Sequence, residues 1–101
     1  MTISRTTRDA TEVVRIEGRF DFAAHRDFRE ALKIALANER AKEIAIDLAA
    51  ADYIDSSALG MLLLSLENAK AAGKPLVLER PSGAVKQVLD IANFQRLFTI
   101  R

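Results

Sequence analysis

The chain contains no cysteine and only one histidine, His25, among its 101 residues. Without cysteine there is no disulfide framework, no thiol nucleophile and no thiolate metal site. A lone histidine cannot supply the cluster of imidazole ligands that many metal centres use. We therefore expect no metal and no other cofactor, and we interpret His25 as a surface or partly covered residue at the start of a helix.

Neither sign of charge is in excess, and no hydrophobic run is long. The chain has 15 basic and 14 acidic residues and a net charge of +1, which argues against a nucleic-acid-binding protein with a basic face. The longest strongly apolar run, residues 58–66, is too short to span a bilayer, and the first residues lack the apolar stretch of a secretory signal. We expect a cytoplasmic protein that binds neither nucleic acid nor membrane.

Signatures of catalysis are also missing. Ser56 and Ser57 do not lie in a Gly-x-Ser-x-Gly elbow, and no glycine-rich loop has the phosphate-binding pattern. A hydrolase built from one of these serines, His25 and an aspartate remains conceivable, but three such residues occur in almost any chain. We interpret the protein as a non-enzyme, with a serine nucleophile as the rival that a covalent serine probe would test.

The hydrophobic pattern predicts one α/β domain over residues 1–101. Half of the residues are apolar, which is enough for one modest core. Strands alternate with helices, which predicts a mixed, mostly parallel sheet of four to five strands with three to four helices. We expect Gly18 to end the second strand. The expected strands are residues 2–7, 11–17, 43–48, 76–79 and 97–100, and the expected helices are 24–38, 56–72 and one that Ser82 caps and Asn93 ends.

Three residues that favour helix N-termini follow one another at the start of the second helix, as Asp55-Ser56-Ser57. Each could accept a hydrogen bond from a free backbone N–H of the first turn. Capping accounts for one such residue, but it does not require three in a row. The serines are therefore candidates for a further role.

The helix that follows is apolar on two sides. One side is a leucine stripe that suffices to dock on a sheet, and Met61 and Leu64 lie on the opposite side. A helix of this kind is either sandwiched or carries a binding surface. We expect Met61 and Leu64 to face a partner, with burial as the open alternative. The docking stripe consists of Leu59, Leu62, Leu63 and Leu66.

The segment 55–60, Asp-Ser-Ser-Ala-Leu-Gly before an apolar helix, resembles the signature of the STAS domain of bacterial anti-sigma factor antagonists. Four further segments resemble the same family, so that the likeness covers nearly the whole chain. They are residues 18–21, 44–48, 73–76 and 85–91. The resemblance implies a STAS-like fold over the single expected domain.

The same resemblance implies a phosphorylation switch. Ser56, with Ser57 as the fallback, would be phosphorylated by a partner that is both an anti-sigma factor and a serine kinase. The unphosphorylated chain would bind this partner and release a sigma factor, and a metal-dependent serine phosphatase would reset the switch. Asp21 would lie near Ser56 at the partner-facing end of the sheet. The expected partner surface is Asp21, Asp55, Ser56, Ser57, Met61 and Leu64.

One rival keeps the fold and removes the switch. In that interpretation the chain is a STAS interaction subunit without a phosphorylation cycle, such as a component of a transport complex. Both interpretations retain the partner-facing helix. They differ in whether Ser56 carries phosphate in cells.

Overall fold

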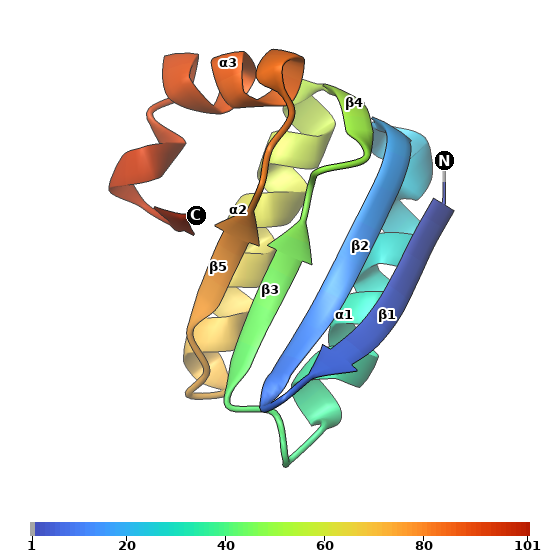
Figure 1. Ribbon diagram of the computed structural model, residues 1–101, viewed down its shortest axis with the longest axis vertical. Helices are drawn as coiled ribbons and strands as arrows, with labels where there is room; N and C mark the ends of the chain where they lie inside the picture. The colour runs from blue at the N-terminus through green and yellow to red at the C-terminus, as the bar shows by residue number, and fades with distance from the viewer. Residues whose placement is uncertain (1) are drawn as a thin grey trace.

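A computed structural model describes residues 2–101 as one mixed β-sheet with two helices, α1 and α2, on one face (Figure 1). The strands are β1 (Thr2–Arg8), β2 (Thr11–Phe20), β3 (Glu43–Asp47), β4 (Ala51–Ile54), β5 (Leu76–Glu79) and β6 (Thr99–Ile100). The helices are α1 (His25–Ala37), α2 (Ser56–Ala71) and α3 (Gly83–Ile91), and the short 3-10 helices are η1 (Phe22–Ala24) and η2 (Phe94–Arg96). In Figure 1, α1 and α2 lie behind the sheet, and α3 lies across its upper end.

The sheet has six strands, in the order β1-β2-β3-β5-β6, with β4 pairing with β2 off this path. β1 and β2 form an antiparallel hairpin, and the other pairs are parallel. The predicted α/β fold with a mixed, mostly parallel sheet is confirmed. The predicted number of strands is too low, because residues 51–54 form β4. The two middle residues of β4, Asp52 and Tyr53, are both exposed and show no alternation, so the hydrophobic pattern does not reveal this strand.

Gly18 does not end β2, contrary to the sequence prediction. Its φ of 83° lies in the left-handed region that favours glycine, and the strand continues to Phe20. β2 pairs with β3 up to Arg15 and with β4 from Gly18 onward, and the register of the second pairing shifts between Gly18 and Arg19. The Gly18 N–H donates to the Ala50 carbonyl oxygen at 2.9 Å, which closes the gap between the two ladders. The extra residues of β2 carry the chain to the start of α2.

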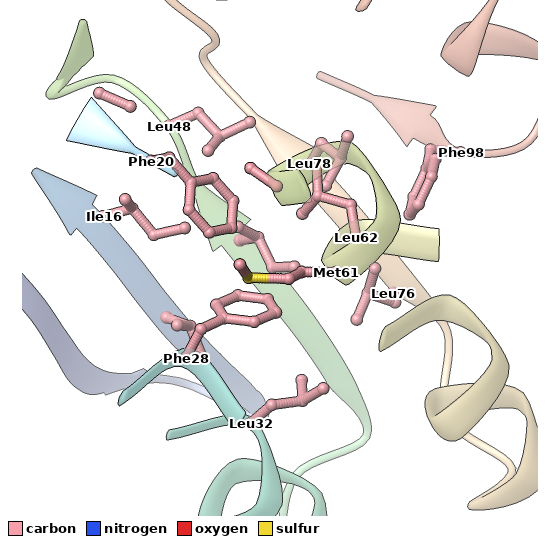
Figure 2. Close-up of a cluster of buried hydrophobic side chains, with 14 of the residues drawn as sticks. Ile16, Phe20, Phe28, Leu32, Leu48, Met61, Leu62, Leu76, Leu78 and Phe98 are labelled. Atoms are coloured by element: carbon pink, nitrogen blue, oxygen red, sulfur yellow. The ribbon is translucent and has the colours of Figure 1, made fainter. Parts of the chain in front are cut away.

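The core fills the space between the sheet and the helices α1 and α2 (Figure 2). Phe20, at the end of β2, and Phe28 of α1 are both buried, and their ring centroids lie 5.2 Å apart in a tilted arrangement. The predicted apolar stripe of α1 is confirmed at Phe28, Leu32 and Ala35, which are buried. The end of β2 and the start of α1 are therefore held by the same aromatic contact.

Helix α2 is covered on two sides, which corrects part of the sequence interpretation. Leu62 is fully buried against the sheet, as expected. Met61, predicted to be exposed, is only 7% exposed, and Figure 2 shows its thioether beside the Phe28 ring of α1. The prediction for Met61 is wrong because α1 packs along the second apolar side of α2. Leu63 was assigned to the docking stripe, but it is 39% exposed.

The exposed apolar side of α2 is therefore formed by Leu63 together with Leu64, which is 47% exposed. The exposure of Leu64 agrees with the prediction. Within the docking stripe, Leu59 and Leu66 are partly buried and pack against the core. The buried side of the helix runs through Ala58, Met61, Leu62, Ser65 and Ala69. The real stripe is thus rotated toward α1 from the one that leucine spacing alone suggests.

The opposite face of the sheet carries ion pairs where helices would otherwise lie. Glu79, buried on this face, accepts hydrogen bonds from Arg8 at 2.8 Å and from Arg101 at 3.1 Å. Arg101 also donates to Glu43 at 2.6 Å, and this guanidinium holds the pKa of the Glu43 carboxyl below its usual value. These contacts tie the segment after β6 to β3 and β5, away from α2.

Leu62→Ala is expected to lower the free energy of unfolding by about 2–5 kcal/mol, because it opens a cavity between α2 and the sheet. Met61→Ala is expected to destabilise the domain by roughly 2 kcal/mol or more, because Met61 fills the space between α1 and α2. Leu64→Ala, on the exposed side of the same helix, is the control and should stay within about 0.5 kcal/mol of wild type. Urea unfolding followed by circular dichroism gives the three values. An unchanged midpoint for Met61→Ala would contradict the packing of α2 against α1.

Candidate functional site

The first turn of α2 is capped by Asp55 and by neither of the serines that follow. Asp55 has extended backbone angles, and its Oδ1 accepts a hydrogen bond from the Ala58 N–H at 2.9 Å. This is the usual geometry of an N-cap residue. Ser56 and Ser57 are the first two helical residues, and both are exposed. The cap therefore leaves both hydroxyl groups available for another role.

Asp21 directly follows the strand whose last residue contacts the N-cap of α2. The Asp55 N–H donates to the Phe20 carbonyl oxygen at 3.3 Å, so the last residue of β2 and the N-cap residue of α2 are neighbours across one backbone hydrogen bond. The Asp21 carboxylate accepts from the Ala23 N–H at 3.0 Å and thereby caps η1. Two acid-capped helical turns thus begin at the same edge of the sheet.

Three exposed side chains that the sequence reading missed lie on the segments that form this edge. Phe22 is 72% exposed in η1, directly after Asp21, and Tyr53 is half-exposed on β4. The Arg19 guanidinium lies 3.9 Å from the centre of the Tyr53 ring, and its Nε is 3.7 Å from Asp21 Oδ2. Tyrosine and arginine are enriched among residues that dominate protein interfaces. Phe22 could have been identified from the sequence, because it lies outside the apolar stripe of α1.

Gly60 has no side chain, so it leaves the helix backbone uncovered on the exposed side of α2. It lies four residues after Ser56, and residues four apart share a helix face. It is not among the glycines with positive φ, which are Gly18 and Gly73, and a Cβ at this position would meet no atom within 4 Å. Glycine inside a helix is about 1 kcal/mol less favourable than alanine. Neither the backbone nor the packing of the described residues requires glycine here.

A groove of about 220 Å³ lies between α1 and α2. It brings together three residues of the predicted partner surface, Ser57, Met61 and Leu64, whereas Ser56 is not among the residues that line it. Phe28, Leu32 and Met61 are its buried apolar residues. The complete lining is His25, Phe28, Arg29, Leu32, Ser57, Gly60, Met61, Leu64, Ser65 and Asn68.

Two features are absent from residues 2–101. Across residues 2–101, no cluster of three or more His, Asp or Glu side chains is placed to hold a metal ion. No helix in the same range is long and apolar enough to cross a bilayer. His25 is exposed, in agreement with its interpretation as a surface residue.

The chain belongs to a recognised class, the STAS domain. The family model described as "Mlab, STAS domain" matches residues 3–99, and the chain is therefore a member of the STAS family. This confirms the resemblance seen in the segment around Ser56. A STAS-domain containing protein of Pseudomonas aeruginosa (strain UCBPP-PA14) is 44% identical over 88 residues, which cover 86% of this chain and 84% of that protein.

Solved structures share the fold at lower identity. An anti-sigma factor antagonist from Mycobacterium paratuberculosis matches with a TM-score of 0.81 at 21% identity, over 98% of this chain and 83% of that chain. The Bacillus protein SpoIIAA matches with TM-scores of 0.75 unphosphorylated and 0.73 phosphorylated, at 20% and 19% identity, over 99% of this chain and 87% and 91% of those chains. A sulfate transporter family protein from Wolinella succinogenes matches with a TM-score of 0.76 at 20% identity, over 91% of this chain and 74% of that chain.

Substitution of Asp55 and Ser56 separates the cap from the exposed hydroxyl. Asp55→Ala removes the side chain that accepts from the Ala58 N–H, and it is expected to lower the free energy of unfolding by about 1 kcal/mol. Ser56→Ala removes no capping hydrogen bond and should leave it within about 0.5 kcal/mol of wild type. Thermal unfolding of both variants measures the difference. A larger loss for Ser56→Ala than for Asp55→Ala would show that Ser56 is the true cap.

Proposed function

We propose that this STAS domain is a cytoplasmic anti-sigma factor antagonist with Ser56 as its switch. Unphosphorylated, it binds a partner that is both an anti-sigma factor and a serine kinase, and a sigma factor is released. Phosphorylation of Ser56 by that partner ends the complex, and a metal-dependent serine phosphatase restores it. The observation that carries the proposal is the exposed Ser56 at the start of α2, where Asp55 already provides the cap.

The position of Ser56 favours it over Ser57 as the modified residue. Ser57 lines the groove between α1 and α2, where the neighbouring helix limits access from one side. Ser56 is not among the residues that line this groove, and Gly60, one turn further along α2, has no side chain to obstruct it. A kinase active site therefore reaches the Ser56 hydroxyl with less obstruction. Ser57 remains the fallback.

Electrostatics explain how a phosphate could switch binding without refolding. A phosphoserine carries roughly −1.5 to −2 charges at neutral pH. At the start of α2, the free N–H groups and the helix dipole favour that charge, so the domain tolerates it. At a packed interface, a buried charge without a partner costs several kcal/mol, while a hundredfold loss of affinity needs only about 2.7 kcal/mol. The carboxylate of Asp55, the residue directly before Ser56, adds repulsion.

The comparisons include relatives of both candidate functions. Antagonists are among the proteins that share the fold, and both the unphosphorylated and the phosphorylated forms of SpoIIAA match the chain to a similar extent. The Wolinella sulfate transporter family protein supports the second candidate, a STAS subunit of a transport complex without a phosphorylation cycle. The two candidates differ in the presence of phosphate on Ser56 and in the class of partner retained.

The cognate anti-sigma kinase is expected to phosphorylate the chain on Ser56 in the presence of ATP. The kinase is first identified by mass spectrometry as the protein retained by the wild-type chain in its native cells, and it is then purified. Phosphopeptide mapping locates the phosphate, with Ser56→Ala and Ser57→Ala as matched controls. Only Ser56→Ala should abolish incorporation. Phosphate confined to threonine or to another serine would refute the assignment, and a transporter subunit as the retained partner would favour the second candidate.

Ser56→Asp is expected to behave as a chain that is permanently switched off, while Ser56→Ala binds and cannot be switched off. The new carboxylate sits in the first turn of α2, where a negative charge suits the helix dipole, so both variants should give wild-type circular dichroism. Binding of Ser56→Asp should fall because its charge is desolvated at the interface. Calorimetry with the purified kinase at matched salt measures both affinities. Equal affinity for the two variants would falsify the switch and leave the fold assignment intact.

A further inference from the structure

Gly60 is a glycine without a structural reason in the isolated domain. Its backbone is not among those with positive φ, and alanine would fit without contact to any atom within 4 Å. Alanine would also favour the helix more strongly than glycine does. Glycine has one further use, which is to let another backbone or ligand approach closely. The bare position therefore points to something outside the described chain that packs there.

We propose that a segment of the anti-sigma partner crosses α2 at Gly60 and inserts an apolar side chain into the groove between α1 and α2. This inference rests on the proposed function, because it takes the anti-sigma factor as the occupant. The crossing segment lies between Ser56 at the start of the helix and Leu64 one turn beyond Gly60. Backbone contact at Gly60 places the partner chain within reach of the Ser56 hydroxyl, one turn away.

The groove has the size and the lining for a single large apolar side chain. A dry cavity of about 150 Å³ binds benzene, and this groove measures about 220 Å³. Phe28, Leu32 and Met61 form its buried apolar part, and the exposed Leu64 borders it. Interface hot spots are typically large side chains that fill well-packed pockets from which water is excluded.

The rim adds a charge preference. Arg29 and His25, on the α1 side of the groove, are both exposed, and no carboxylate lines the groove itself. Glu30 borders the adjoining depression, where Arg29 and Lys33 also lie. The partner segment is therefore expected to carry a carboxylate next to its apolar anchor, where it would meet Arg29.

The test uses Gly60→Ala, which should change stability and binding in opposite directions. In the isolated domain, the melting temperature should rise by about 4 °C, because alanine is the better helix former. Affinity for the purified anti-sigma kinase should fall about tenfold, because the added methyl overpacks the contact. Gly83→Ala is the matched control. It also adds a methyl to a helical glycine with nothing within 4 Å, but outside the groove, and affinity should stay at the wild-type value.

The charge of the rim has its own readout. Arg29→Ala should weaken binding of the same kinase and make the remaining affinity less dependent on salt, because one interfacial ion pair is gone. If the affinity of Arg29→Ala depends on salt as strongly as that of wild type, the proposed partner carboxylate does not meet Arg29.

The outcomes separate this inference from the proposed function. If the wild-type chain binds the kinase, Ser56→Asp does not, and Gly60→Ala binds as tightly as wild type, the inference is wrong and the switch stands. If no anti-sigma kinase binds the wild-type chain, the proposed function itself fails. A lower melting temperature for Gly60→Ala would give the glycine a role in the fold and overturn the inference. If the wild-type chain sediments as a dimer and Gly60→Ala does not, with kinase affinity unchanged, the groove is the interface with a second copy of the chain. That result would also overturn the inference.

Discussion

The hydrogen bond from the Asp55 N–H to the Phe20 carbonyl oxygen, at 3.3 Å, joins the end of β2 to the start of α2. The bond exists because β2 does not stop at Gly18 but changes partner there and runs on beside β4. Without those last residues, Asp21 and Ser56 would belong to unrelated loops. The left-handed backbone of one glycine is thus the constraint on which the proposed site depends. Phe20, packed against Phe28, fixes this junction from the inside.

The sequence was informative where the pattern was long and one-sided. The stripe of α1, the short apolar strand β5 and the left-handed Asn93 after α3 follow from spacing and residue type, and the structure has all three. The motif around Ser56 pointed to the correct family because several short matches occurred in the right order. Such features depend on local chemistry, which a single sequence displays directly.

The features that the sequence did not reveal depend on tertiary neighbours. Nothing in the spacing of Met61 shows that α1 lies against it, and Leu63 looks like a docking leucine until the direction of the sheet is known. Asp55, Ser56 and Ser57 are equally good caps on paper, and only the extended backbone of Asp55 decides among them. Ser82 illustrates the reverse case. It occupies the N-cap position of α3, but its hydroxyl donates to the Ala51 carbonyl oxygen and ties α3 to β4.

Because Asp55 carries the cap, the side-chain cap of α2 does not depend on the neighbouring Ser56. Under the proposed switch, regulation and stability are encoded in adjacent but separate side chains. A lineage can replace the serine with a residue that no kinase modifies and still retain the same folded domain. Regulated switches and constitutive adaptors can therefore arise from one another on this scaffold through a single substitution, without passing through an unstable intermediate.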